Sequence, residues 1–253
     1  MNPKIGVIYT SFLRDELMKR TLQSIVNNWH EDFVVLIGDQ RDSVPPLFNT
    51  AITEMRKKGL INYFMLPFDC GLSRSRNFLV EQAAKFGLEY CLITADSIEF
   101  TPETIERMDD VKQYLKNSQT GILGFNIKNK VSWEYFMDLK EGKFILTNNF
   151  NDYLDLQTRL VLKDCDICRN FFLAKTEILL KVQWDNELKL CEHEDFFWRI
   201  KQAGYKVKWT PNVSGSYIDF KPPNYLEYRM RIYKEFMKLL QMKYKLNGWV
   251  EYQ

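Results

Sequence analysis

Three short segments of the chain carry residue types that could do chemistry, and the first ends in Asp96. This aspartate follows an apolar run at residues 89–94. A carboxylate at the end of a buried strand lies at the edge of a sheet, where a divalent cation that bridges a diphosphate needs oxygen ligands. An ordinary carboxylate in a turn or a helix cap explains the same residue, and the sequence leaves both interpretations open.

The second segment is acidic and aromatic and runs from Cys191 to Arg199. Its three carboxylates, Glu192, Glu194 and Asp195, lie within four residues at the expected start of a helix. Acidic residues in a first helical turn interact favourably with the helix dipole, which is the simplest explanation. The cluster exceeds what a cap needs, however, so one carboxylate could act as a general base whose pKa is set by burial and neighbouring charge.

The third segment, residues 71–77, has the sequence Gly-Leu-Ser-Arg-Ser-Arg-Asn. A glycine and small hydroxyl side chains lead into a helix there, and the arginines are Arg74 and Arg76. A helix N-terminus beside arginine side chains is a natural anion-binding site. A capped helix whose arginines face water is an equally simple reading.

The cysteines and histidines give weaker signals. Cys165 and Cys168 form a CxxC pair that could bind zinc together with Cys191 and His193, but no second pair with metal-ligand spacing supports such a site. A cysteine nucleophile also lacks support, because the chain has only two histidines and the sequence pairs neither with a cysteine.

Alternating apolar runs and amphipathic repeats position these segments in the first half of the chain. Strands are expected at residues 4–10, 33–39, 61–66, 89–94 and 120–127, and helices at 13–28, 47–58, 73–86 and from Pro102 onwards. This order predicts an α/β fold with a mixed, mostly parallel sheet flanked by helices. Ligands of such sheets bind at the carboxyl ends of the strands. The site is therefore expected near Thr10, Ser11, Asp39, residues 70–77 and Asp96.

The second half has a different pattern. We expect antiparallel hairpins within residues 128–163, an apolar run at 171–180, a helix at 192–203 and a strand at 205–210 that Pro211 ends. Residues 224–246 form an amphipathic helix with a basic end. This C-terminal helical extension either docks on the rest of the molecule or contacts an anionic membrane surface or a partner.

Composition narrows the function classes. The chain has 253 residues, of which 45% are hydrophobic and 27% charged, and its net charge is only +2. A nucleic-acid binder needs a strong basic excess, so nucleic acid is excluded as a partner. No apolar segment is long enough to span a membrane, and the N-terminus lacks the pattern of a signal peptide. Five scattered cysteines are typical of a reducing compartment, so we expect a cytoplasmic protein.

In this order the segments resemble inverting, nucleotide-sugar-dependent glycosyltransferases of the GT-A fold, of the family 2 type. The closest resemblance is to the β-1,4-N-acetylgalactosaminyltransferases, and it covers residues 4–217. Its firmest part is Asp166-x-x-x-Asn170-Phe171-Phe172-Leu173-Ala174-Lys175-Thr176, followed by Trp184-Asp185 and by Glu192-His193-Glu194-Asp195-Phe196-Phe197. Leu66-Pro67-Phe68, Gly71 and Arg76-Asn77 add to it.

The resemblance implies a division of the chain and a donor site. Residues 1–220 would be the catalytic domain, with a nucleotide-binding half at 1–125 and an acceptor-binding half at 126–220, and residues 221–253 a helix packed on or beside it. The donor would be a nucleoside-diphosphate sugar, and the resemblance favours a UDP-sugar. Residues that match nucleotide-contacting positions are Thr10, Ser11, Asp39 and Arg76, and Asp96 matches the carboxylate that binds Mn²⁺ or Mg²⁺ on the diphosphate.

The resemblance also implies the catalytic groups. Asp195 matches the general base that takes the proton of the acceptor hydroxyl, and Glu194, the other expected catalytic residue, would orient the acceptor together with His193. The expected acceptor-binding residues are His193, Trp184 and Asn170. Transfer to a glycan hydroxyl would then invert the anomeric centre.

Two departures from the family pattern weaken the metal site. Only Asp96 remains where the family has two or three acidic residues, and the stretch Ser214–Tyr217 lacks the histidine often found there. The metal would therefore be weakly bound or dispensable. A non-catalytic nucleotide-sugar or glycan-binding module is the alternative function, whereas a nucleotidyltransferase lacks its Gly-rich loop at residues 4–16. The donor sugar, the acceptor and the oligomeric state stay open.

Overall fold

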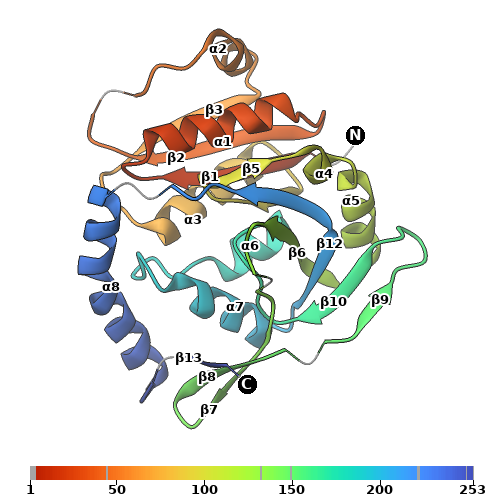
Figure 1. Cartoon of the computed structure of the whole chain (residues 1–253), viewed down its shortest axis with the longest axis vertical. Helices are drawn as coiled ribbons and strands as arrows, with labels where there is room; N and C mark the ends of the chain where they lie inside the picture. The colour runs from red at the N-terminus through yellow and green to blue at the C-terminus, as the bar shows by residue number, and fades with distance from the viewer. Residues whose placement is uncertain are drawn as a thin grey trace.

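A mixed sheet of ten strands runs through the molecule, with helices on both of its faces (Figure 1). The computed structural model describes residues 4–43, 45–131, 133–148, 150–220, 223–248 and 250–252. The sheet has the order β3-β2-β1-β4-β11-β6-β12-β10-β9, and β5 pairs with β12 beside this path. One sheet thus joins strands from the first and the second half of the chain.

The first four strands are parallel. They are β1 (Ile5–Ser11), β2 (Phe33–Gln40), β3 (Ile61–Leu66) and β4 (Tyr90–Ile93), connected by α1 (Asp15–Asn27), α2 (Thr50–Lys57) and α3 (Leu72–Lys85). The sequence pattern predicted each of these elements to within a few residues. Because the four strands are parallel, their carboxyl ends lie at one edge of the sheet.

Beyond β4 the sheet becomes mixed. The chain continues through β5 (Ile98–Phe100), α4 (Pro102–Ile105), α5 (Met108–Asn117) and β6 (Thr120–Lys128), and later through β9 (Asp152–Leu154), β10 (Val161–Cys165) and β11 (Phe172–Lys175). β11 is antiparallel to both of its neighbours, β4 and β6. The predominance of parallel pairing therefore holds for the N-terminal half alone.

The strand expected to end at Pro211 does not end there. β12 (Lys206–Tyr217) passes through the proline and pairs in parallel with β6, with a register shift between Thr210 and Ser214. A proline is tolerated in a strand at such an irregularity, where no ladder hydrogen bond is lost. This prediction was wrong, and the longer strand carries Tyr217 further along the sheet.

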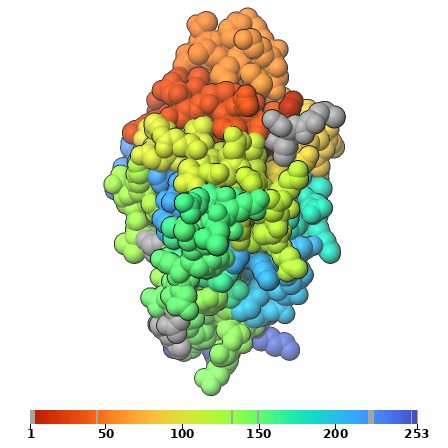
Figure 2. Space-filling view, turned by 90° about the vertical axis from the view of Figure 1, so that its right-hand side faces the viewer, coloured from red at the N-terminus to blue at the C-terminus, as the bar shows by residue number. Residues whose placement is uncertain are grey.

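The remaining elements cover one end and one side of the sheet. β7 (Phe136–Lys140) and β8 (Lys143–Thr147) form the expected hairpin, to which β13 (Val250–Tyr252) adds a third strand. The helices are α6 (Thr176–Val182), α7 (Glu192–Gln202) and α8 (Pro223–Tyr244). In the space-filling view the N-terminal strands and α2 form one end of an elongated molecule and residues near 140 the other (Figure 2).

Two apolar cores lie on the two faces of the sheet. Ile5, Val7 and Tyr9 of β1 pack with α1 and α5, whereas Ile8 packs with α3, α6 and α7. This alternation follows from the period of two in a strand. α8 docks on the second core through Phe236 and Leu240, whose exposed fractions are 6% and 0%. No helix within the described residues is both long and apolar enough to cross a membrane.

Candidate functional site

A cavity of about 570 Å³ opens at the carboxyl ends of β1 and β4. The start of α7 and the first turns of α8 close its other sides. Six of the residues expected to bind a substrate or a metal or to act in catalysis line it, namely Thr10, Arg76, Asp96, Asn170, His193 and Glu194. Chain segments that are far apart in the sequence therefore meet at one site, at the edge of the sheet where the fold pattern placed it.

Asp96 lies at the floor of this cavity and is 4% exposed. One carboxylate oxygen accepts a hydrogen bond from Ser11 at 3.2 Å, and the other lies 2.9 Å from a guanidinium nitrogen of Arg14. Burial raises the pKa of Asp96 to about 6, although Arg14 and Ser11 favour the charged form. The carboxylate is thus an ionised, paired group at neutral pH.

These contacts do not fit a metal site built by the protein. Both oxygens of Asp96 already have partners. Within the described ranges, no group of three or more histidine, cysteine, aspartate or glutamate side chains is arranged to hold a metal ion. The zinc alternative also lacks support, because Cys165 and Cys168 are buried in the apolar core.

Asp39 lies deeper than expected. It is 1% exposed, and its Oδ2 atom accepts hydrogen bonds from Arg41 and from the hydroxyl of Tyr63, each at 2.6 Å. Its other oxygen is buried and has no hydrogen-bond partner among the residues described. A buried carboxylate oxygen without a donor is costly, so a ligand N–H or O–H that reached it would be bound favourably.

Arg76 connects the two halves of the site. It comes from the first turns of α3 and forms a buried ion pair with Glu192 at the start of α7, with 2.7 Å between nitrogen and oxygen. Its guanidinium also lies 5.4 Å from the ring centroid of Trp184. The segment of residues 71–77 is therefore joined to the acidic segment through a charge pair, and Arg76 does not simply face water.

Consecutive side chains in the first turn of α7 lie in different environments. Cys191, just before the helix, has a left-handed backbone conformation with φ of 60°. Glu194 lines the cavity, and burial raises its pKa to about 7, with Glu192 adding to the shift. A carboxyl group with this pKa is half ionised near neutral pH, which suits a general base.

His193 is kept neutral by its environment. Burial lowers its pKa to about 4, and its Nδ1 atom lies 3.0 Å from the side-chain oxygen of Asn170. Trp133 packs against the imidazole with 5.2 Å between ring centroids. The expected acceptor residues His193 and Asn170 are therefore joined in one hydrogen-bonded pair at the cavity wall.

Asp195 is not part of the cavity lining. It is 0% exposed, and Arg199, Lys243 and Tyr244 surround its carboxylate at 2.7, 2.6 and 2.7 Å. These partners occupy both oxygens and tie α7 to the end of α8. The resemblance assigned the base to Asp195, whose carboxylate in this structure is buried among these partners and does not line the cavity.

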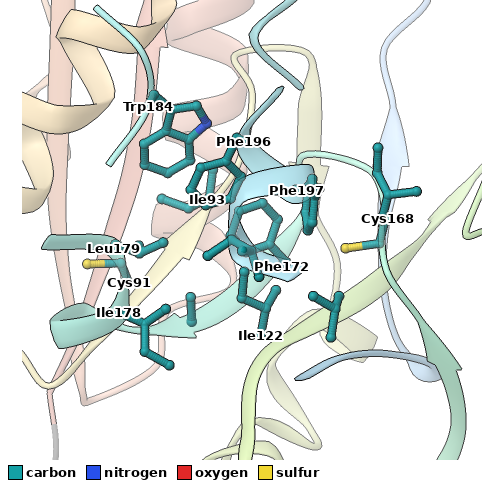
Figure 3. Packing of buried hydrophobic residues seen from close by; sticks show 14 of the residues in the cluster. Cys91, Ile93, Ile122, Cys168, Phe172, Ile178, Leu179, Trp184, Phe196 and Phe197 are labelled. Atoms are coloured by element: carbon teal, nitrogen blue, oxygen red, sulfur yellow. The ribbon is translucent and has the colours of Figure 1, made fainter. Parts of the chain in front are cut away.

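Trp184 is a core residue in this structure. It is 2% exposed, and its ring stacks on Phe196 with centroids 4.2 Å apart and planes 11° from parallel (Figure 3). This position leaves no open ring face for a sugar. Sequence reasoning missed the aromatic residues that do line the cavity, which are Trp133, Tyr217, Phe220, Tyr225 and Tyr233. Only the helical periodicity at 224–246 hinted at the last two.

Comparisons of the sequence with known proteins find similarity to glycosyltransferases. No family model matches the chain. In sequence the chain is similar to mouse β-1,4 N-acetylgalactosaminyltransferase 2, with 27% identity over 198 residues, and to mouse β-1,4 N-acetylgalactosaminyltransferase 1, with 23% identity over 201 residues. Each match covers 76% of this chain and 35% of the relative, so the chain spans about a third of the length of these proteins.

The solved structures extend the comparison to the fold. Staphylococcus aureus TarS 1–349 in complex with UDP-GlcNAc matches with a TM-score of 0.63 and 15% identity, over 94% of this chain and 66% of that one. GalNAc-T7 with UDP, GalNAc and Mn²⁺ matches with a TM-score of 0.63 and 12% identity, over 94% of this chain and 50% of that one. The chain has the GT-A fold of these glycosyltransferase structures, and its resemblance in sequence to the β-1,4-N-acetylgalactosaminyltransferases is confirmed.

Proposed function

We propose that this chain, which has the GT-A glycosyltransferase fold, transfers a sugar from a UDP-sugar to a hydroxyl of a glycan acceptor with inversion. The observation that carries the proposal is the cavity itself. It brings the arginine-paired Asp96, at the end of the parallel strands, together with Glu194, a carboxyl group whose pKa is about 7. The diphosphate needs positive charge, which Arg14 supplies beside Asp96, and the acceptor hydroxyl needs a general base close to it.

The donor side is formed by strand ends. We place the nucleotide near Thr10 and Arg76, with the diphosphate toward Arg14 beside Asp96. Asp39 does not line the cavity, but it pairs in register with Ser11 at the neighbouring strand end. The free oxygen of Asp39 suits the imide N–H of a uracil or a ribose hydroxyl. The UDP and UDP-GlcNAc complexes of TarS support a uridine donor for this fold.

We assign the general base to Glu194 in place of Asp195. Glu194 would accept the proton of the acceptor hydroxyl while that oxygen forms a bond to the anomeric carbon. The bond from the anomeric carbon to the diphosphate oxygen breaks at the same time, and UDP leaves with the bonding electrons. Arg76 and the other arginines of the cavity stabilise the charge that develops on this leaving group.

Three neighbouring residues would position the acceptor. The neutral imidazole of His193, held by Asn170, offers a hydrogen-bonding atom without adding charge beside Glu194. Trp133 supplies an aromatic surface next to it. Aromatic rings with a nearby polar group suit the alternating apolar and hydroxyl faces of a sugar.

A screen of nucleotide sugars by thermal shift tests the donor. Ligand binding raises the melting temperature by mass action, so a UDP-sugar should raise it where the matching GDP-sugar does not. The product of transfer from the best donor is then analysed by NMR for its anomeric configuration. Retention of configuration would refute the inverting assignment, and the absence of any nucleotide-sugar shift would refute the donor.

A non-catalytic binding module is the second candidate, favoured by the pairing of Asp96 with Arg14. Slow hydrolysis of the bound donor separates the two functions. A transferase is expected to release free sugar and UDP from the donor in the absence of acceptor, whereas a binding module leaves the donor intact. Loss of that hydrolysis in Glu194→Gln would assign it to this site.

A further inference from the structure

We propose that arginine side chains hold the diphosphate of the donor, with Arg14 in the place of a divalent cation, so that donor binding needs no metal. The proposal rests on the proposed nucleotide-sugar function. Its first observation is the contact between Arg14 and Asp96, with 2.9 Å between Nη2 and Oδ1. The one carboxylate at the expected metal position thus already holds a cation.

Arg14 is fixed in place. Its side chain is 13% exposed and lines the cavity just before α1. The guanidinium lies 4.7 Å from the ring centroid of Tyr225, so it is held between a carboxylate and an aromatic face. Its Nε atom has no hydrogen-bond acceptor in the part of the chain that the structure describes. A preorganised guanidinium with spare donors is well suited to phosphate oxygens.

A metal ion would compete with this arrangement. To bind Asp96 it would have to displace Arg14 from one oxygen, while the other accepts the hydrogen bond of Ser11. Mg²⁺ and Mn²⁺ prefer several oxygen ligands, and no further acidic cluster is available among the described residues. Displacement would also leave a buried guanidinium without its counter-ion, which is unfavourable.

The charges of the cavity match the ligand. Five cationic side chains line it against three carboxylates: Arg14, Arg76, Lys130, Arg169 and Arg229 against Asp96, Glu192 and Glu194. Asp96 and Glu192 are already in ion pairs. When Glu194 is ionised, the surplus of two positive charges equals the two negative charges of a sugar-nucleotide diphosphate. Arg229 comes from α8, where it bonds to the hydroxyl of Tyr225 at 3.0 Å, so the C-terminal helix supplies part of the surplus.

Calorimetric titration of the unmodified chain with UDP tests the proposal directly. It is done once with excess EDTA and once with Mn²⁺, and electron paramagnetic resonance follows the binding of Mn²⁺ itself. We expect equal UDP affinity in the two buffers and no protein-bound Mn²⁺. UDP binding that appears only with Mn²⁺ would overturn the metal-free site and leave the proposed function standing. No UDP binding in either buffer would refute both.

Variants at Arg14, which caps α1, and at Lys19 within α1 show which side chain sets the affinity for UDP. Arg14→Ala should weaken UDP binding in EDTA about tenfold to a hundredfold, the scale of a lost charge-assisted hydrogen bond. Mn²⁺ should then restore part of the affinity, because Asp96 is free to bind it. Arg14→Lys should keep more of the affinity than Arg14→Ala. Lys19→Ala, which removes a partly exposed cation on the same helix, should match the unmodified chain.

Two outcomes of the variant series would count against the proposal. UDP affinity of Arg14→Ala equal to that of the unmodified chain would remove Arg14 from the site. An equal loss in Lys19→Ala would mean that overall charge, and not position, sets the affinity. Circular dichroism checks that each variant is folded, and the EDTA comparison on the unmodified chain decides the proposal if Arg14→Ala is not.

Discussion

The two sides of the cavity that we propose for the donor and the acceptor, called the donor side and the acceptor side, are built from different kinds of element. The donor side consists of the ends of parallel strands, β1 and β4, and of Arg76 in α3. The acceptor side depends on the first turn of α7. At a strand end the alternation of side chains and the sheet edge fix where a residue lies. In a helix each residue is rotated by about 100° from the one before, so neighbours face different surroundings.

Glu194 and Asp195 show what this difference means. The two adjacent carboxylates have opposite environments, one at the cavity and one in a buried ion network with α8. A motif that names two neighbouring acids does not say which of them reaches a ligand. Variants of the two residues can therefore separate a general base at Glu194 from a stabilising ion network at Asp195.

Glu194→Gln should give the largest effect and tests the acceptor side. Removing a general base lowers kcat by about 10²–10⁴-fold, whereas glutamine keeps the size of the side chain. UDP affinity, measured by calorimetry, should stay within about twofold of the unmodified chain, because the donor side is untouched. Glu187→Gln, an exposed acid of the same half, is the control and should keep full activity. Full activity in Glu194→Gln would remove it from the mechanism.

Asp195→Asn should act on stability. It removes the charge that Arg199 and Lys243 share, and breaking a buried ion pair costs about 3–5 kcal/mol of the free energy of unfolding. Urea denaturation measures the loss. Glu54→Gln, which breaks an exposed pair with Lys57, should cost less than about 1 kcal/mol. Unchanged stability together with a kcat loss as large as that of Glu194→Gln would return the base to Asp195.

Asp39→Asn should give a smaller effect on activity, confined to the donor side, and should also lower the free energy of unfolding, because it removes the buried charge that pairs with Arg41. A lost hydrogen bond from ligand to carboxylate is worth about 1.5 kcal/mol, or about tenfold in affinity. If Asp39 contacts the nucleoside, uridine and UDP should lose affinity by the same factor, with kcat unchanged at saturating donor. A loss for UDP without one for uridine would move Asp39 to the phosphate region.

The sequence predicted most of the donor side and less of the acceptor side. The periodicity of residues 4–94 was strong enough to place the strands, and the strand ends then placed Thr10 and Asp96 at the cavity. Arg14 was missed, because it reaches the site through its ion pair with Asp96, which lies 82 residues later in the sequence. Contacts of this kind are set by the tertiary fold and leave no local pattern.

On the acceptor side, two residues that the resemblance implied do not line the cavity. Trp184 was a plausible sugar-stacking residue by type, but its ring fills the core against Phe196. Asp195 meets Tyr244 across 49 residues, so its burial depends on where α8 docks. Helical periodicity predicted α8 as an element. It did not predict the face that docks, nor that Tyr225 and Arg229 would close the cavity.

The pH dependence of kcat/KM for transfer, measured in parallel for the unmodified chain and Glu194→Gln, tests the central claim most directly. The base acts in its ionised form, and burial raises the pKa of Glu194 to about 7. The rate of the unmodified chain should therefore rise with pH through about 7 and level off above it, while His193, with a pKa of about 4, stays neutral. The residual rate of Glu194→Gln should lack the limb near 7 and keep only a change near 6, the pKa of Asp96. The same limb in both proteins, or none in the unmodified chain between about pH 5.5 and 8, would contradict Glu194 as the general base.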